Sequence, residues 1–136
     1  IHAEATSDIP ATLRNIRKAG ARSSLGIKPN TDISQYADLI DDVDMFLIMT
    51  VEPGFGGQSF MHEQMDKVKT ARSRIELIKG GKPLIQVDGG ISLETIGEAA
   101  SAGANCFVAG SAVYRSADPE NMVQLLRKSA EEHFKY

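Results

Sequence analysis

Leu84-Ile85-Gln86-Val87-Asp88-Gly89-Gly90-Ile91 is the stretch of sequence that decides the fold. Its apolar run is too short for a helix and is bounded by glycines, which predicts a buried strand. The next residues are typical of a helix start, with Ser92 as the N-cap and Glu94 in the first turn. Asp88 is therefore expected at the carboxyl end of a strand, the edge at which parallel sheets bind ligands. The alternative is a turn cap without any ligand, because Asp-Gly also closes ordinary turns.

Short apolar runs alternate with helical periodicities along the whole chain. The predicted strands lie at residues 1–6, 24–28, 45–51, 84–88 and 105–109. The run at 45–51 is the most apolar and is expected to be buried on both faces. This alternation predicts an α/β fold with parallel strands and right-handed crossovers. Two architectures fit: an open five-stranded sheet, or five β-α units of a (β/α)8 barrel, which needs about 200 residues or more when complete.

Three glycine-containing turns follow the predicted strands. Residues 53–58, Pro-Gly-Phe-Gly-Gly-Gln, allow backbone N–H groups to approach a ligand closely, although a mobile loop without a ligand has the same composition. Gly89-Gly90 and Gly110-Ser111 each precede a predicted helix, whose positive end favours anions. If the last two strands close a barrel, these two turns stand where barrels commonly hold phosphate.

The composition predicts one soluble, cytoplasmic domain. The chain has 136 residues, is 42% hydrophobic, and carries a formal net charge of -3. It contains no apolar run of the roughly 18 residues that span a membrane, no secretory signal and no basic stripe, so neither a membrane nor a nucleic-acid partner is expected. The single cysteine excludes an intrachain disulfide and fits a reducing compartment.

Several further side chains allow two interpretations each. Met49 either fills the core or covers a ligand pocket, and Lys28 forms either a rim ion pair or a phosphate contact. His2 is equally compatible with packing and with function. The remaining candidates are expected to be structural, with His62 and His133 solvated on helices and Cys106 buried in the core.

Taken together, these motifs resemble the ribulose-phosphate 3-epimerase family, (β/α)8 enzymes of the pentose phosphate pathway. Residues 49–58, Met-Thr-Val-Glu-Pro-Gly-Phe-Gly-Gly-Gln, are similar to the signature loop of the family almost residue for residue. Val87-Asp88-Gly89-Gly90 and residues 102–112 match at the expected spacing. The resemblance covers essentially the whole chain but corresponds to strands four to eight of the barrel. It implies that residues 1–136 are the C-terminal part of a single ribulose-phosphate-binding TIM-barrel domain.

The resemblance implies an isomerase that interconverts D-ribulose 5-phosphate and D-xylulose 5-phosphate by C3 proton abstraction, through an enediolate stabilised by one divalent metal (Zn, Fe, Mn or Co). Asp88 falls on one of the two catalytic aspartates of the family and is expected to be both acid/base and metal ligand. The other aspartate and both histidine ligands lie on family strands outside this chain, and His2 aligns with neither histidine. The residues expected to bind substrate are Met49, Gly54, Phe55, Gly56, Gly57, Gly89, Gly90, Gly110 and Ser111.

Three functional hypotheses remain open at this point. The first is an epimerase represented by part of its barrel, with little or no activity in this polypeptide alone. The second is a non-catalytic half-barrel that binds a phosphorylated ligand or self-assembles. The third is a hexulose-phosphate synthase, against which the loop at residues 52–58 favours the epimerase. Since strands cut from a barrel leave two unpaired edges, we also expect a homo-oligomer.

Overall fold

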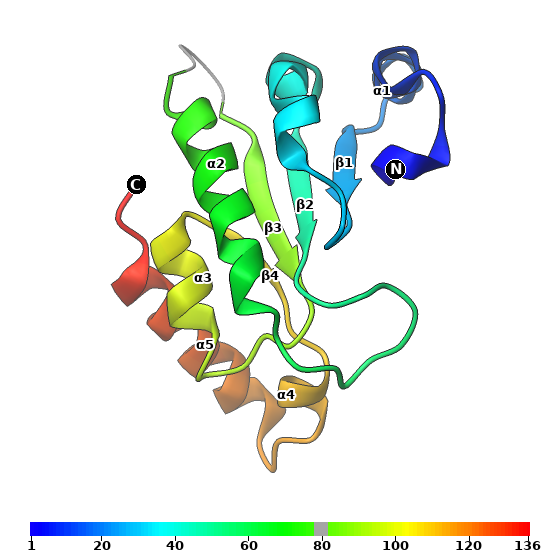
Figure 1. Ribbon diagram of the computed structural model, residues 1–136. Helices are drawn as coiled ribbons and strands as arrows, with labels where there is room; N and C mark the ends of the chain where they lie inside the picture. Colours follow the sequence, from blue (N-terminus) through cyan, green and yellow to red (C-terminus); the bar gives the residue numbers. More distant parts are fainter. Residues whose placement is uncertain (78–81) are drawn as a thin grey trace.

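A four-stranded parallel sheet forms the centre of the molecule in the computed structural model, which describes residues 1–77 and 82–136. The strands follow the order of the chain across the sheet (Figure 1): β1 (Ser24–Ile27), β2 (Met45–Met49), β3 (Leu84–Asp88) and β4 (Cys106–Val108). Each strand pairs in parallel with the next. The predicted α/β class with parallel strands is confirmed.

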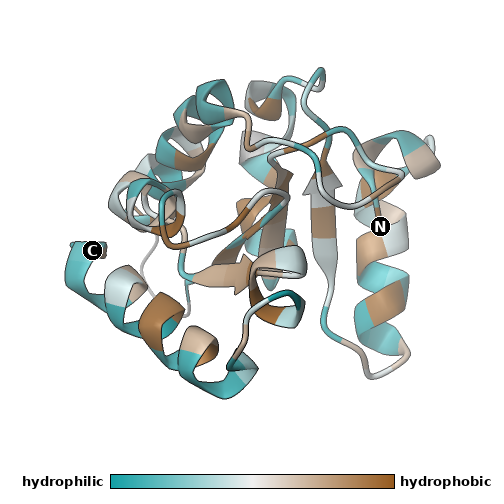
Figure 2. Cartoon of the chain, turned by 90° about the horizontal axis from the view of Figure 1, so that it is seen from below, coloured by the Kyte–Doolittle hydropathy of each residue, from teal (hydrophilic) through white to brown (hydrophobic). Residues whose placement is uncertain are grey.

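Helices connect these strands and lie around one side of the sheet, as the view in Figure 2 shows. They are α1 (Ile9–Lys18), α2 (Met65–Ile75), α3 (Ile96–Ala102), α4 (Ser111–Tyr114) and α5 (Pro119–His133), with 3-10 turns η1 (Ala3–Ala5), η2 (Ile33–Asp42) and η3 (His62–Gln64). Local sequence explains where α1 and α5 begin. The carboxylates of Asp8 and Asp118 accept N–H groups of the first turn, and each helix has a proline at its first or second position. No helix among the described residues is long and apolar enough to cross a membrane.

The two faces of the sheet differ in burial. The face packed on the helices is fully apolar and contains Leu25, Ile27, Phe46, Ile48, Ile85 and Val87, each at most 1% exposed. On the other face the side chains remain partly open, and Leu84 and Val108 are 37% and 39% exposed. The prediction that β2 is buried on both faces is therefore wrong for Met45 and Leu47, which are half-buried.

Residues 1–6 do not form the predicted strand. Only His2 pairs with β1, through an isolated bridge to Gly26, and the following Ala-Glu-Ala segment turns into η1. Alanine and glutamate are strong helix formers, and this preference outweighs the pairing of a segment at the chain end. The His2 ring lies over Gly26, where an added Cβ would come within 3.2 Å of it.

The helix after β3 also begins later than predicted. Ser92 belongs to a turn in which its N–H donates to the Thr95 hydroxyl at 2.9 Å, while α3 starts at Ile96. The Ser92 hydroxyl donates to the Glu94 carboxylate and accepts the Glu94 backbone N–H at 3.3 Å, so its side chain closes this turn rather than the first turn of α3. The helical periodicity after residue 58 also predicts a buried stripe that extends to Ile78, a position outside the described residues.

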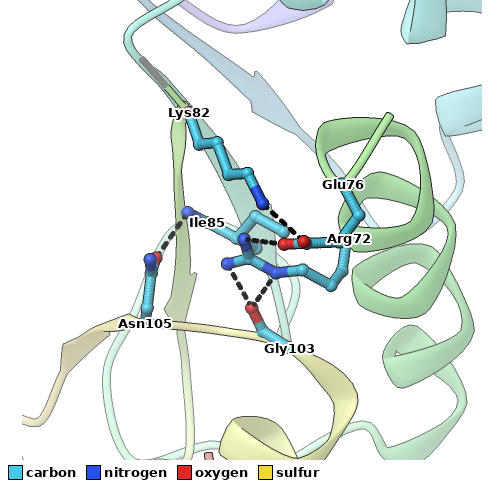
Figure 3. Close-up of polar contacts among 6 residues, drawn as sticks. All are labelled: Arg72, Glu76, Lys82, Ile85, Gly103 and Asn105. Atoms are coloured by element: carbon cyan, nitrogen blue, oxygen red, sulfur yellow. Dashed lines mark hydrogen bonds and ion pairs between the residues drawn. The ribbon is translucent and has the colours of Figure 1, made fainter. Parts of the chain in front are cut away.

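A buried arginine joins helix α2 to the turn before β4 (Figure 3). Arg72 is only 3% exposed, and its Nε and Nη2 donate to the carbonyl of Gly103 at 2.9 and 2.7 Å. Glu76 pairs with both Arg72 and Lys82, and the Arg72 guanidinium lies 5.5 Å from the centroid of the Phe134 ring. Lys82 and Gly103 precede β3 and β4, so this cluster stabilises the amino end of the sheet.

Candidate functional site

At the opposite, carboxyl end of β2, β3 and β4, the loops surround an open pocket of about 360 Å³. Every residue predicted above to bind substrate or to catalyse lines this pocket: Met49, Gly54, Phe55, Gly56, Gly57, Asp88, Gly89, Gly90, Gly110 and Ser111. The structure thus brings together three motifs that are far apart in the sequence.

Asp88 lines the pocket at the carboxyl end of β3. It is the last residue of β3, and the strand register places it between Met49 of β2 and Val108 of β4. Side chains in register on neighbouring strands point to the same face of a sheet, so the carboxylate is flanked by two apolar side chains. It is half-buried, which leaves it accessible to a ligand in the pocket.

The turn after Asp88 has a conformation that only glycine adopts without strain. Gly89 and Gly90 have φ angles of +125° and +66°. A Cβ at Gly89 would meet the Val51 side chain at 2.5 Å, and one at Gly90 would meet the backbone of Phe60 at 2.6 Å. Both glycines are therefore required by the close approach of the β2 loop as well as by their backbone angles.

The glycine-rich loop at residues 52–58 is held by its last side chain. Gln58 Nε2 donates to the carbonyls of Glu52 and Phe55 at 2.7 and 2.9 Å, and so joins the start of the loop to its middle. Gly54 and Gly57 have φ angles of +143° and +79°, which this compact path requires. The loop keeps the aromatic ring of Phe55 exposed beside the pocket.

Backbone donors at the strand ends remain available for a ligand. In the part of the chain that the structure describes, the N–H groups of Gly89, Gly90 and Gly110 donate to no backbone acceptor. The carbonyl of Gly110, by contrast, accepts the N–H groups of Val113 and Tyr114 at 3.0 Å, which fixes the turn. A Cβ at Gly110 would meet nothing within 4 Å, so the space beside this backbone is open.

Only one of the two predicted helix starts lies at this pocket, because α4 begins at Ser111, which lines it. The turn at Gly90 is separated from α3 by residues 91–95, and α4 after Gly110 is a single turn. An anion in the pocket would therefore meet individual N–H groups of the turns, and a helix dipole contributes less than expected.

Lys28, a candidate phosphate contact in the sequence, is absent from the residues that line the pocket. Its carbonyl, with that of Pro29, accepts the Lys67 ammonium, and burial lowers the pKa of Lys67. Lys67 on α2 therefore supports the loop after β1, a role that its position on a helix did not reveal.

The other candidates are structural. His62 is exposed and pairs with Glu98 at 2.7 Å, and His133 is exposed with Nδ1 at 2.7 Å from the carbonyl of Ser129, in agreement with the predictions. Cys106 is half-buried rather than buried, and its thiol donates to Gln86 Oε1 at 3.1 Å. Partial burial raises the pKa of this thiol.

The described residues do not by themselves form the metal site that the resemblance implies. Across residues 1–77 and 82–136, no three His, Cys, Asp or Glu side chains are grouped so that they could hold a metal ion. The acidic side chains that line the pocket are Asp88 and Glu52. Asp88 remains the predicted ligand, without partners among the described residues.

Sequence reasoning missed some of the pocket wall. The additional lining residues are Val51, Glu52, Pro53, Gln58, Ile91 and Val108. Most of them belong to the same motifs as the predicted residues, so their position next to the glycines could have predicted that they line the pocket. Val108 alone required the strand register, because its partner in the sheet, Asp88, belongs to another strand.

The sheet, its helices and a pocket at the carboxyl ends of the strands define a (β/α)-barrel type of architecture. Solved structures with the same arrangement include the 3-hexulose-6-phosphate synthase of Salmonella typhimurium, with a TM-score of 0.60 and 21% identity, covering 92% of this chain and 56% of that one. The BexX/CysO complex of Amycolatopsis orientalis matches with a TM-score of 0.60 and 23% identity, over 91% of this chain and 47% of that one. These likenesses show the fold.

The sequence assigns the family within this fold. The model of the ribulose-phosphate 3 epimerase family matches residues 1–114, and this chain belongs to that family. The ribulose-phosphate 3-epimerase of Mycobacterium leprae is 47% identical over 131 residues, 95% of this chain and 57% of the relative. That of Bacillus subtilis is 40% identical over 130 residues, 95% of this chain and 59% of the relative. The chain thus spans somewhat more than half the length of these relatives.

Proposed function

We propose that residues 1–136 form part of a barrel domain that binds D-ribulose 5-phosphate and D-xylulose 5-phosphate and interconverts them at C3. The observation that carries the proposal is the pocket, in which the loops after three strands meet around Asp88. Family membership supports the same activity, because the relatives that match this chain are named ribulose-phosphate 3-epimerases.

Asp88 is proposed as the acid/base. Its carboxylate would remove the C3 proton, which the neighbouring C2 carbonyl acidifies, and the protonated carboxyl would return a proton in the reverse direction. A positioned group of this kind contributes typically about 10²–10⁴-fold to the rate. Inversion at C3 also needs a proton donor on the opposite face of the sugar. The resemblance places that donor on strands outside this chain, so the proposal is for activity within a whole barrel.

The N–H groups of Gly89, Gly90 and Gly110, which have no partner among the described residues, are proposed to bind the phosphate. They lie at the ends of β3 and β4, beside Asp88, and the surrounding backbone is accessible. Neutral N–H donors suit an anion in a chain with a net charge of -3, because no excess of lysine is needed. With the phosphate fixed, C3 of the sugar has a defined position relative to Asp88.

A divalent metal would supply charge stabilisation at the reacting oxygens when bound. In this stretch Asp88 would be its ligand, and the remaining ligands that the resemblance implies lie on other strands. No step proposed for Asp88 or for the glycine turns depends on the metal.

The activity is best tested in a chimera in which this chain replaces the matching part of the Mycobacterium leprae relative. The measurement is exchange of the C3 hydrogen of D-ribulose 5-phosphate with solvent deuterium, followed by NMR. Asp88→Asn is expected to lower the exchange rate at least about 100-fold, because an amide does not accept the proton. Asp38→Asn changes an exposed carboxylate on η2 and should leave the rate unchanged.

Two results would contradict the proposal separately. A folded chimera without any exchange would refute the epimerase activity of this chain. Exchange at a near-normal rate in the Asp88→Asn chimera would remove Asp88 from the reaction while leaving the activity in place.

A second function is favoured by one observation, the partly exposed inner face of the sheet. Leu84 and Val108 are open there, and β4 pairs only with β3 among the described strands. An unpaired strand edge beside apolar side chains is a template for association. A non-catalytic assembly of this polypeptide, able to bind a phosphorylated ligand, is the alternative proposal, and its test is the association state discussed below.

A further inference from the structure

Thr50 is a buried residue whose chain neighbours, Met49 and Val51, line the pocket. It follows β2 directly and is 0% exposed, between the apolar side chains of Met49 and Val51. Its Oγ1 donates to the carbonyl of Gly89 at 2.6 Å, and its backbone N–H donates to the carbonyl of Asp88 at 2.9 Å. Thr50 thus holds two consecutive carbonyls of the turn that follows the Asp88 side chain.

The bond from the Thr50 hydroxyl replaces one that the sheet does not supply. The N–H of Thr50 continues the parallel pairing of β2 with β3 by one bond. The backbone of Gly89 then turns away with a φ of +125°, and regular pairing ends. The hydroxyl reaches one residue further than the backbone and donates to the carbonyl of Gly89, which supplies the bond that the sheet does not.

These two bonds also determine where the N–H groups point. A trans peptide is planar, and its N–H is directed opposite to its C=O; the described residues contain no cis peptide bond. The carbonyls of Asp88 and Gly89 face Thr50 on the β2 side, so the N–H groups of Gly89 and Gly90 face the β4 side. Gly110 follows β4 there, with its own N–H unpaired among the described backbone groups.

We propose that Thr50 is a positioning residue for anion binding: its hydroxyl fixes the Gly89–Gly90 peptide so that consecutive N–H groups converge with that of Gly110 on the phosphate of the ligand. This inference rests on the proposed function, since it assigns the phosphate to the same pocket. Thr50 acts through the backbone of the glycine turn and needs no contact with the ligand itself. Its hydroxyl, rather than its size, is the required feature.

The matched variants for this inference are Thr50→Ser and Thr50→Ala. Both lose the same methyl group, so the difference between them isolates the hydroxyl. Thr50→Val tests the same point with the volume retained. The 136-residue chain is titrated by calorimetry with inorganic phosphate and with D-ribulose 5-phosphate, and D-ribulose without phosphate is the control ligand.

We expect Thr50→Ala and Thr50→Val to weaken phosphate binding about tenfold or more, the factor that loss of one hydrogen bond to a charged group produces. The phosphate affinity of Thr50→Ser should stay within about threefold of that of the wild type, because the hydroxyl is retained. In NMR spectra of Thr50→Ala, the amide signals of Gly89 and Gly90 should shift and broaden, while hydrogen exchange at Ile85 and Val87 within β3 stays unchanged. A role in stability alone would instead accelerate exchange throughout the sheet.

Three outcomes would overturn the inference. If Thr50→Ala binds phosphate as tightly as Thr50→Ser, the hydroxyl does not position the donors. If Thr50→Ala and Thr50→Val fail to fold, Thr50→Ser alone decides the matter. This variant retains the hydroxyl, so weakened phosphate binding at wild-type stability would contradict the inference. If the wild-type chain binds neither phosphate probe, the pocket assignment in the proposed function fails, and the role of Thr50 in anion binding fails with it.

Discussion

Replacement of Arg72 by methionine is expected to destabilise the fold without changing the pocket. Methionine has a similar length and helix propensity, so α2 itself should persist. The substitution removes two donors from the buried carbonyl of Gly103, at 2.9 and 2.7 Å, and the contact of the guanidinium with the ring of Phe134. It also leaves Glu76 with Lys82 as its remaining partner.

The magnitude follows from these contacts. Each hydrogen bond from a charged donor contributes about 1.5–3 kcal/mol, but both reach the same oxygen and so count for less than their sum. The cation–π contact adds about 0.5–2 kcal/mol. Burial of the guanidinium lowers the pKa of Arg72, and the cost of burying this charge disappears in the variant, which offsets part of the lost stability. We expect the free energy of unfolding to fall by about 3 kcal/mol, a large share of the roughly 5–15 kcal/mol of a typical domain.

Urea denaturation followed by circular dichroism measures this change. With a slope of about 2 kcal/mol/M, the midpoint should fall by about 1.5 M. Arg74→Met, on the same helix but exposed, is the control and should shift the midpoint by less than about 0.3 M, since surface substitutions usually stay within about 0.5 kcal/mol. Equal midpoints for the two variants would refute the assignment of Arg72 as a stabilising buried contact.

Three further predictions concern ligand binding, pH and association. Gly110→Val should weaken D-ribulose 5-phosphate binding at least about tenfold, because its side chain would occupy the open space beside this backbone, where a Cβ meets no atom within 4 Å; unchanged affinity of the folded variant by calorimetry would place the phosphate elsewhere. The N–H of Ser23, 2.7 Å from the carboxylate, and the charge of Arg17 hold the pKa of Asp44 below its usual range. Because the folded state favours the carboxylate, this stability is complete above the unfolded pKa of about 4 and is lost as the pH falls through the lower folded value. Asp44→Asn should therefore remove about 1 kcal/mol at pH 7 and flatten the acid limb of a stability profile, and an unaltered profile would contradict this. Finally, the 136-residue polypeptide should self-associate through its open strand edge and inner face in sedimentation experiments, whereas a monomer that unfolds cooperatively would argue against an exposed, adhesive edge.

The sequence predicted the pocket well because its signals are local. A short apolar run that ends in Asp88 and two glycines defines a strand end without knowledge of the rest of the fold. Parallel alternation then places the ends of different strands together, which is why residues 54–57 and Gly110 meet Asp88. Turn chemistry and strand order together were sufficient for this part of the structure.

The features that sequence reasoning missed depend on contacts between distant residues. The hydroxyl of Thr50 binds a carbonyl 39 residues away, and Arg72 binds one 31 residues away. Neither partner is a side chain, so no complementary residue in the sequence marks these bonds. At Ser92 and at residues 1–6 the error was local: side-chain hydrogen bonds and helix propensity changed the ends of elements, where periodicity contains the least information.

The two ends of the sheet have different chemical properties, and this difference separates stability from binding. At the amino end, the polar groups of Arg72, Glu76 and Gly103 are joined to one another. At the carboxyl end, the glycine N–H groups have no partner in the described backbone, and Gly89 and Gly90 have positive φ angles. Glycine N–H groups without a partner in the described backbone remain available to an anion, which supports the proposed binding site at this end. Substitutions at Arg72 should accordingly change unfolding but not phosphate affinity, and phosphate should raise the melting temperature of the wild-type chain more than that of Thr50→Ala.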